Sequence, residues 1–144
     1  MTFSQRSEPF SVQLGDELPH REFKPDNVQL FLYNAILWNA HRIHFDETYT
    51  TEVEGYPGLV IAGPMIGDWL HQCVEDWLGE EGRLVSMEYS NRIAAYIGET
   101  LHYGGNVIAL DSDSQEARVE VFIKNEAGKI VAPGEATVLF ANKE

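Results

Sequence analysis

The chain has 144 residues, the length of one ordinary domain, and 44% of them are hydrophobic, which is enough for a single core. Ten Lys and Arg residues stand against 23 Asp and Glu residues, so the formal net charge is −13. A surface that follows nucleic-acid phosphates needs clustered basic residues, so this balance argues against binding to nucleic acid and to anionic membranes. A small anionic ligand, held by a local group of Arg side chains and N–H donors, remains compatible with it.

Cysteine content and hydropathy indicate the compartment. Cys73 is the single cysteine of the sequence, which excludes an intrachain disulfide and a cysteine-built zinc cluster. Residues 1–10 lack the apolar run of a secretory signal, and no later run is long enough to span a bilayer. We therefore expect a cytoplasmic protein that folds as one domain over residues 1–144, with residues 1–12 as a loose terminus.

The first half of the chain predicts two helices joined by a long loop. A short strand is expected in residues 17–23, and Asp26 or Asn27 can then cap a helix that runs to about Trp38. Residues 39–58 show no periodicity and predict a long ordered loop with one helical turn after Phe45, followed by a strand-like run at 59–61. A second helix follows Pro64 and ends at Gly79 and Gly82.

Apolar residues recur at helical spacing in both helices. In the first helix they predict one buried face, formed by Val28, Phe31, Leu32, Ala35 and Ile36. In the second they form a broad stripe suited to being wrapped by a sheet: Met65, Ile66, Trp69, Leu70, Cys73, Val74, Trp77 and Leu78.

From Arg83 onward the apolar residues alternate with polar ones, which predicts half-buried strands at 85–90, 101–110, 117–123 and 129–140. Residues 125–128 predict a hairpin turn, and Pro133 indicates a bulge or an edge. The order of elements predicts an α+β fold in which an antiparallel sheet wraps around one long central helix. Because one layer of sheet leaves its other face exposed, we expect a dimer.

Two segments carry a motif. Residues 39–46 read Asn-Ala-His-Arg-Ile-His-Phe-Asp, and residues 54–64 read Glu-Gly-Tyr-Pro-Gly-Leu-Val-Ile-Ala-Gly-Pro. Together they resemble the hydratase motif of MaoC-like hotdog proteins. R-specific enoyl-CoA hydratases of that family have an Asp, a His five positions later, an Asp two positions after that, and a downstream His-Gly that opens the central helix. Asn39, His44, Asp46 and the pair Ala62-Gly63 stand at these positions, so Asn39 and Ala62 depart from the family's residues.

The motif is most similar to the subgroup that contains mesaconyl- and itaconyl-CoA hydratases and fungal-type 3-hydroxyacyl-thioester dehydratases. Chains of that subgroup usually carry two hotdog repeats, and residues 27–140 resemble the catalytic repeat alone. The resemblance implies a hotdog fold and the reversible addition of water to a 2-enoyl-CoA, giving a (3R)-3-hydroxyacyl-CoA. It implies no metal and no redox cofactor, with the acyl group carried as a CoA or acyl-carrier thioester.

This chemistry needs a base for the attacking water, a proton for C2 and hydrogen-bond donors for the thioester oxygen. His44 is the candidate acid and base, because the ordinary histidine pKa of about 6.5 suits both roles. Asn39 can orient the water but cannot accept its proton. The N–H of Gly63 is the candidate oxyanion donor, because a helix N-terminus presents unpaired N–H groups.

Since position 39 lacks the family's carboxylate, three outcomes are open. His44 works alone, another group substitutes (His41, Asp46, Glu52 or Glu54), or activity is lost. The candidate substrate-binding residues are His41, Arg42, Asp46, Tyr56 and Ala62. Arg42 either binds a CoA phosphate or substrate carboxylate, or pairs with Asp46 or Glu47, and Asp46 itself is interpreted as an orienting or capping residue.

Two other functions compete with a self-sufficient hydratase. A non-catalytic or partner-dependent hotdog subunit fits the single repeat and Asn39, and an acyl-CoA thioesterase shares the fold. As partners we expect an acyl-CoA substrate and a second copy in a homodimer or higher homo-oligomer, with a second hotdog subunit as the alternative. The pocket is expected at the subunit interface, with His44 and Asn39 on one wall and the start of the long helix on the other.

Overall fold

The computed structural model describes residues 12–141, so the predicted loose terminus lies outside the described residues except for its last residue. The elements are, in chain order, β1 (Arg21–Phe23), α1 (Asn27–Ile36), a 3₁₀-helix (Arg42–His44), a π-helical turn (Tyr49–Val53), α2 (Gly63–Leu78), β2 (Gly82–Tyr89), β3 (Leu101–Asp111), β4 (Glu116–Lys124) and β5 (Ile130–Phe140).

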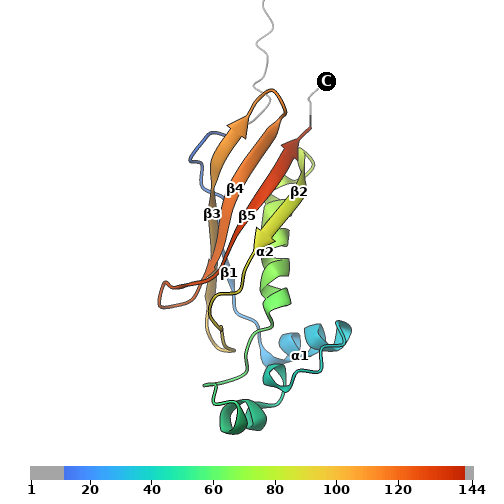
Figure 1. The fold of residues 1–144 in the computed structure, drawn as a ribbon, viewed down its shortest axis with the longest axis vertical. Coiled ribbons are helices and arrows are strands. Elements are labelled where there is room, and N and C mark those ends of the chain that lie inside the picture. Colours follow the sequence, from blue (N-terminus) through green and yellow to red (C-terminus); the bar gives the residue numbers. More distant parts are fainter. Residues whose placement is uncertain (1–11, 142–144) are drawn as a thin grey trace, which may run out of the picture.

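The five strands form one antiparallel sheet in the order β1-β3-β4-β5-β2. Figure 1 shows α2 lying along this curled sheet, with α1 and the two short helices gathered at the end where α2 begins. The predicted α+β fold, with an antiparallel sheet wrapped around one long helix, is confirmed. Because β2 pairs with β5 and not with β3, it forms one edge of the sheet.

Helix α2 forms the centre of the core. It starts after Ala62 with Pro64 in its first turn, where the missing N–H costs nothing, and it ends at Gly79, whose φ is +55°. The predicted apolar stripe is confirmed: all its members are buried except Trp77, which is half-buried against Phe140. The inner face of the sheet meets this stripe with small branched side chains, among them Val119, Val121 and Val138, each fully buried. Such burial contributes about 1.5–3 kcal/mol per side chain.

For α1, the predicted N-cap is confirmed, whereas the face that was predicted to be buried is exposed. Asp26 caps the helix, with mutual hydrogen bonds between Asp26 and Gln29. The predicted face is exposed instead: Val28, Phe31, Leu32, Ala35 and Ile36. The helix buries Leu30 and Asn34, and it ends at Ile36, before Trp38 adopts a φ of +57°. An amphipathic pattern specifies an apolar face but not what covers it, and within residues 12–141 this face remains largely uncovered.

Three smaller predictions concern the run at 59–61, the turn at 125–128 and Pro133. Residues 59–61 form no strand, only a bridge between Val60 and Tyr96. The hairpin turn at 125–128 is confirmed, with Gly128 at a φ of +76°. Pro133 lies in β5, between β4 and β2, so the edge interpretation is wrong; the pairing of β4 with β5 does shift register nearby, between Ile123 and Lys124.

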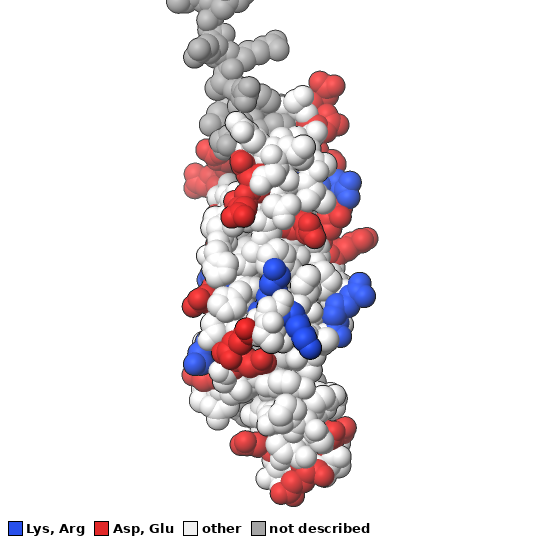
Figure 2. All heavy atoms as spheres, turned by 90° about the vertical axis from the view of Figure 1, so that its left-hand side faces the viewer, with Lys and Arg blue, Asp and Glu red and all other residues white. Residues whose placement is uncertain are grey.

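Acidic side chains spread along the whole length of the face in Figure 2, in agreement with the net charge. Among residues 12–141, no helix is long and apolar enough to cross a membrane.

Candidate functional site

His44 ends the 3₁₀-helix and is a buried polar residue, 7% exposed. Its Nδ1 lies 2.6 Å from the carbonyl oxygen of Val60. Because a carbonyl oxygen can only accept a hydrogen bond, Nδ1 carries the proton and the neutral ring keeps its lone pair on Nε2. Within residues 12–141 this Nε2 has no hydrogen-bond partner, so it is free to take a proton from a ligand or from water.

The surroundings of His44 keep its ring neutral. Burial lowers the pKa of His44 and is the largest influence, because the charged form loses its hydration. The carbonyl of Val60 raises the pKa and His41 lowers it, and the net result is a pKa below the ordinary value. At neutral pH the ring is therefore in the form that acts as a base.

A pocket of about 360 Å³ opens beside this ring. It is lined by Ile43, His44, Val60, Ile61, Gly63, Ile66, Asn91, Arg92, Ile93, Ala94 and Ala95. The lining is mainly apolar with a few polar groups, the usual character of a small-molecule site, and it contains no carboxylate.

Main-chain hydrogen bonds join the three segments that form this pocket. The N–H of Val60 donates to Ile43 (2.9 Å), and the N–H of Ile61 donates to Ala95 (2.8 Å). The N–H of Ile97 donates to Leu59 (3.0 Å). Residues around 43, 60 and 95 are thus held together although long stretches of sequence separate them.

Gly63 brings the N-terminus of α2 to the same pocket. The N–H groups of Met65 and Ile66 donate to the carbonyl of Ala62, whereas the N–H of Gly63 has no partner within residues 12–141. A Cβ at position 63 would overlap the side-chain nitrogen of Asn91, so glycine is needed for this close approach. The structure therefore brings together the predicted base and the predicted oxyanion donor.

Asn39 and His41 do not line the pocket. The side-chain oxygen of Asn39 accepts a hydrogen bond from the N–H of His41 (3.1 Å), which orients the loop. The ring of His41 stands edge-on to that of His44, with 5.6 Å between centroids. Ala62 is fully buried as the residue before α2 and lies outside the lining as well.

The remaining predicted residues form a separate network on the loop. Arg42 pairs with Asp46 at 2.8 Å and stacks 4.0 Å from the ring centre of Tyr49. Asp46 also accepts from the N–H of Tyr49, and this bond, more than Arg42, lowers the pKa of Asp46. Glu54 accepts from the Tyr49 hydroxyl, and Tyr56 lies 6.2 Å from the ring of Tyr96. Of the two interpretations of Arg42, the structure shows the pairing with Asp46.

The motif points to neither Asn91 nor Arg92. Both line the pocket from the segment that follows β2. That segment has no periodicity and no motif. Only the three-dimensional structure shows that it passes the start of α2 and brings both residues to the pocket.

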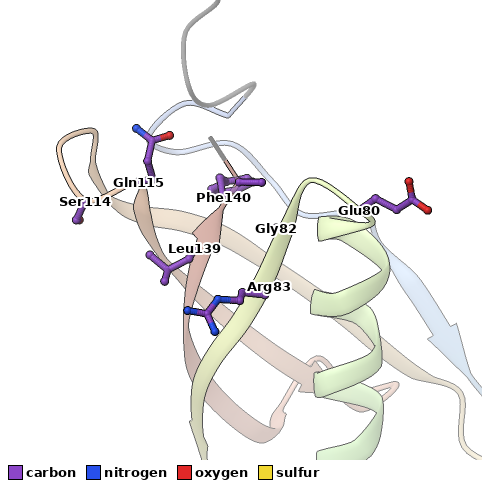
Figure 3. A pocket seen from close by; sticks show the side chains of 8 residues that line it. Glu80, Gly82, Arg83, Ser114, Gln115, Leu139 and Phe140 are labelled. Carbon is purple, nitrogen blue, oxygen red and sulfur yellow. The ribbon is translucent and has the colours of Figure 1, made fainter. Parts of the chain in front are cut away.

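A second hollow, of about 410 Å³, lies at the other end of α2 (Figure 3). It is lined by Glu80, Gly82, Arg83, Ser114, Gln115, Leu139, Phe140 and Ala141. No motif residue reaches it, and it lacks a histidine, so the pocket beside His44 is the candidate active site.

Comparison with known proteins gives a family match and curated relatives. Residues 3–97 match the family described as hydroxyacyl-thioester dehydratase type 2. Over 46 residues the chain is 50% identical to mesaconyl-C(4)-CoA hydratase of Chloroflexus aurantiacus; this segment is 32% of the present chain and 16% of that protein. In the other curated relatives, too, the matched part is less than a third of their length.

Solved structures share the fold. The (R)-hydratase of A. caviae superposes with a TM-score of 0.83 at 16% identity, covering 91% of this chain and 98% of that one. The ChsH1-ChsH2 complex of Mycobacterium tuberculosis gives a TM-score of 0.80 at 17% identity, covering 92% and 100%. These structures confirm the hotdog fold. The family match over residues 3–97 confirms the resemblance drawn from the motif.

Proposed function

Because the chain belongs to the hydroxyacyl-thioester dehydratase type 2 family, we propose that it catalyses the reversible addition of water to a 2-enoyl thioester, giving a (3R)-3-hydroxyacyl thioester. The observation that carries the proposal is the buried His44, whose ring nitrogen Nε2 is unprotonated and unpaired beside an apolar pocket within residues 12–141. The name of the C. aurantiacus relative supports CoA as the carrier.

The geometry supports a mechanism with one acid–base group. His44 Nε2 takes a proton from water while the water oxygen bonds to C3 of the substrate, and the electron pair of the double bond moves toward the thioester carbonyl. The N–H of Gly63 donates to the oxygen where negative charge develops. The protonated imidazole then gives its proton to C2, so that H and OH have been added and His44 is neutral again. Besides the water and the substrate, these steps use His44 and Gly63 of the chain.

The Val60 carbonyl assists this cycle. It fixes Nδ1 as the protonated nitrogen, so Nε2 is the one available for chemistry, and it stabilises the imidazolium that forms after the first proton transfer. Burial opposes the charged form, so the proton is returned readily to carbon.

We further propose that a second hotdog chain covers α1. Its exposed apolar residues form a patch that we call the α1 face: Val28, Phe31, Leu32, Ala35, Ile36. Residues 27–40 contain no Asp, Glu, Lys or Arg, so the α1 face of a second copy brings no like-charge contact within this face, although each chain carries a net charge of −13. Patches of this kind usually mark interfaces.

A partner-dependent subunit is the second candidate function. The specific observation in its favour is the absence of a carboxylate from the lining of the pocket within residues 12–141. A second subunit that supplies this group would complete the site.

The test is the loss of enoyl-thioester ultraviolet absorbance when the purified chain meets a panel of 2-enoyl-CoAs, including crotonyl, mesaconyl and long-chain examples. The expected result is turnover with the wild-type chain and none with His44→Ala, while circular dichroism shows an intact fold. Release of free CoA thiol would indicate a thioesterase instead. Turnover that requires a second hotdog protein and survives loss of His44 would favour the partner-dependent subunit. The cytoplasmic location stays a prediction, to be tested by cell fractionation.

A further inference from the structure

We propose that Asn91 is a catalytic residue of this site and that its side-chain amide donates the second hydrogen bond to the thioester oxygen, beside the N–H of Gly63. The inference rests on the proposed hydratase function and adds a residue that neither the motif nor the family match assigns. Three observations carry it: the approach of Asn91 to Gly63, the freedom of its amide, and its place in the pocket of His44.

The first observation is the distance between the two donors. The side-chain Cγ of Asn91 lies 3.0 Å from the point where a Cβ of residue 63 would stand, and the side-chain nitrogen is closer still. Since the backbone nitrogen of a residue is about 2.5 Å from its Cβ position, the two nitrogen atoms are separated by less than about 5.5 Å. Two donors at that separation can each come within about 2.9 Å of one oxygen atom.

The second observation is that no hydrogen bond within residues 12–141 occupies the side-chain amide of Asn91. Within residues 12–141 its side chain makes no hydrogen bond, whereas the next residue, Arg92, donates to the Ser90 hydroxyl at 2.8 Å. Asn91 is also an exposed residue on the segment after β2. A structural asparagine of a turn usually bonds the backbone nearby, so this side chain is available to a ligand.

The third observation is the shared cavity. Asn91, Gly63 and His44 line the same pocket from three segments of the chain. A thioester lying between them would have its carbonyl at the helix start and its double bond toward the imidazole. An amide suits this position because it donates without carrying charge, so it stabilises the developing oxyanion and leaves the pKa of His44 undisturbed.

This arrangement gives a second reason why residue 63 is a glycine. A methyl group at position 63 would displace the Asn91 amide while leaving the backbone N–H of residue 63 in place. The effect of Gly63→Ala on catalysis should therefore pass through Asn91, and this coupling can be measured.

The experiment is a double-mutant cycle with Asn91→Ala, Gly63→Ala and both together, assayed for hydration of the best 2-enoyl-CoA. Removing one oxyanion donor typically costs about 10²–10³-fold in kcat, so Asn91→Ala should lower kcat by about 10²-fold with little change in KM. Asn91→Asp should lower kcat further, because a carboxylate cannot donate and repels the oxyanion. Gly63→Ala alone should also lower kcat, and the double variant should be no slower than Asn91→Ala.

Several results would overturn the inference. A kcat of Asn91→Ala close to that of the wild type, with the wild type active, removes the residue from catalysis and leaves the proposed function standing. Losses that multiply in the double variant show that the methyl group at position 63 obstructs the substrate and not Asn91. A wild-type chain without turnover on the whole panel refutes the proposed function, and the inference falls with it. Circular dichroism and thermal unfolding of each variant exclude misfolding as the cause of a loss.

Discussion

Lowering the pH from about 7.5 to about 5 is expected to weaken both folding and turnover through His44. In the unfolded chain this imidazole takes up a proton near pH 6.5, the ordinary value. In the folded chain burial holds its pKa lower, so the ring stays neutral to a more acidic pH. Between these two pKa values the unfolded state binds more protons than the folded state, and the free energy of unfolding therefore decreases as the pH falls.

The size of this change in the free energy of unfolding follows from the titration of one group, the imidazole of His44. The contribution of His44 to stability is fully present above about pH 6.5 and is lost at up to about 1.4 kcal/mol per pH unit as the pH falls toward the folded pKa. Asp46 and Asp111 also have displaced pKa values, but theirs are lowered from 3.8, so their contributions are lost only at more acidic pH. The window just below pH 6.5 therefore separates the imidazole from these two carboxylates.

The assay is urea unfolding at several pH values for the wild type and His44→Gln. The glutamine amide can donate to the Val60 carbonyl but does not titrate, so the difference in stability between the two proteins isolates the proton. This difference should move in favour of the variant below pH 6.5, and kcat/KM of the wild type should fall about tenfold per pH unit below the folded pKa. A stability difference that is constant from pH 7.5 to 5 would refute the assignment of a buried, neutral His44.

Three further results are expected. Asn39→Asp should fold with unchanged stability, because a carboxylate oxygen accepts from the N–H of His41 as the amide does, and kcat should be preserved or raised; a large loss would show that the neutral amide is required. Leu30→Ala, at a fully buried position of α1, should lower the free energy of unfolding in urea by about 2–5 kcal/mol. Ile36→Glu, at a position that is 83% exposed, should leave this free energy nearly unchanged and reduce the assembly size measured by light scattering. An unchanged assembly size would contradict an interface at the α1 face. Tyr103→Phe should raise thermal stability by about 1 kcal/mol, because the buried Tyr103 hydroxyl has no partner within residues 12–141, and a destabilised variant would argue for a bound water.

The two helices show what an apolar pattern can and cannot predict. Both carry apolar residues at helical spacing, and in α2 the stripe is buried as expected because the sheet that covers it belongs to the same chain. In α1 the same kind of pattern lies exposed, since periodicity reports that a face avoids water without identifying its partner. The sequence also predicted the strands from 85 onward and the turn at Gly128 from local alternation and turn chemistry.

The site divides in a similar way. His44 and Gly63 could be found from the motif, because its spacing sets a histidine before a glycine that opens a helix. Asn91 could not, since it is brought to Gly63 by the path of the chain after β2 and no local pattern encodes that contact. Asn39 matched the motif by position, yet its side chain holds the loop at His41 and lies outside the pocket lining. The spacing of a motif predicts which residues lie near one another in the fold. The direction of each side chain depends on the surrounding loop.

The main-chain bonds that join residues 43, 60 and 95 have a consequence for how such a site can diversify. They hold the walls of the pocket, and through the Val60 carbonyl they also hold the imidazole, without using any side chain but that of His44. Ile43, Ile66 and Ile93 line the cavity from the same framework. In the proposed hydratase, substitutions at these three isoleucines can therefore change the space for the acyl chain while His44 and Gly63 stay in place. Substrate range and chemistry are then able to change independently.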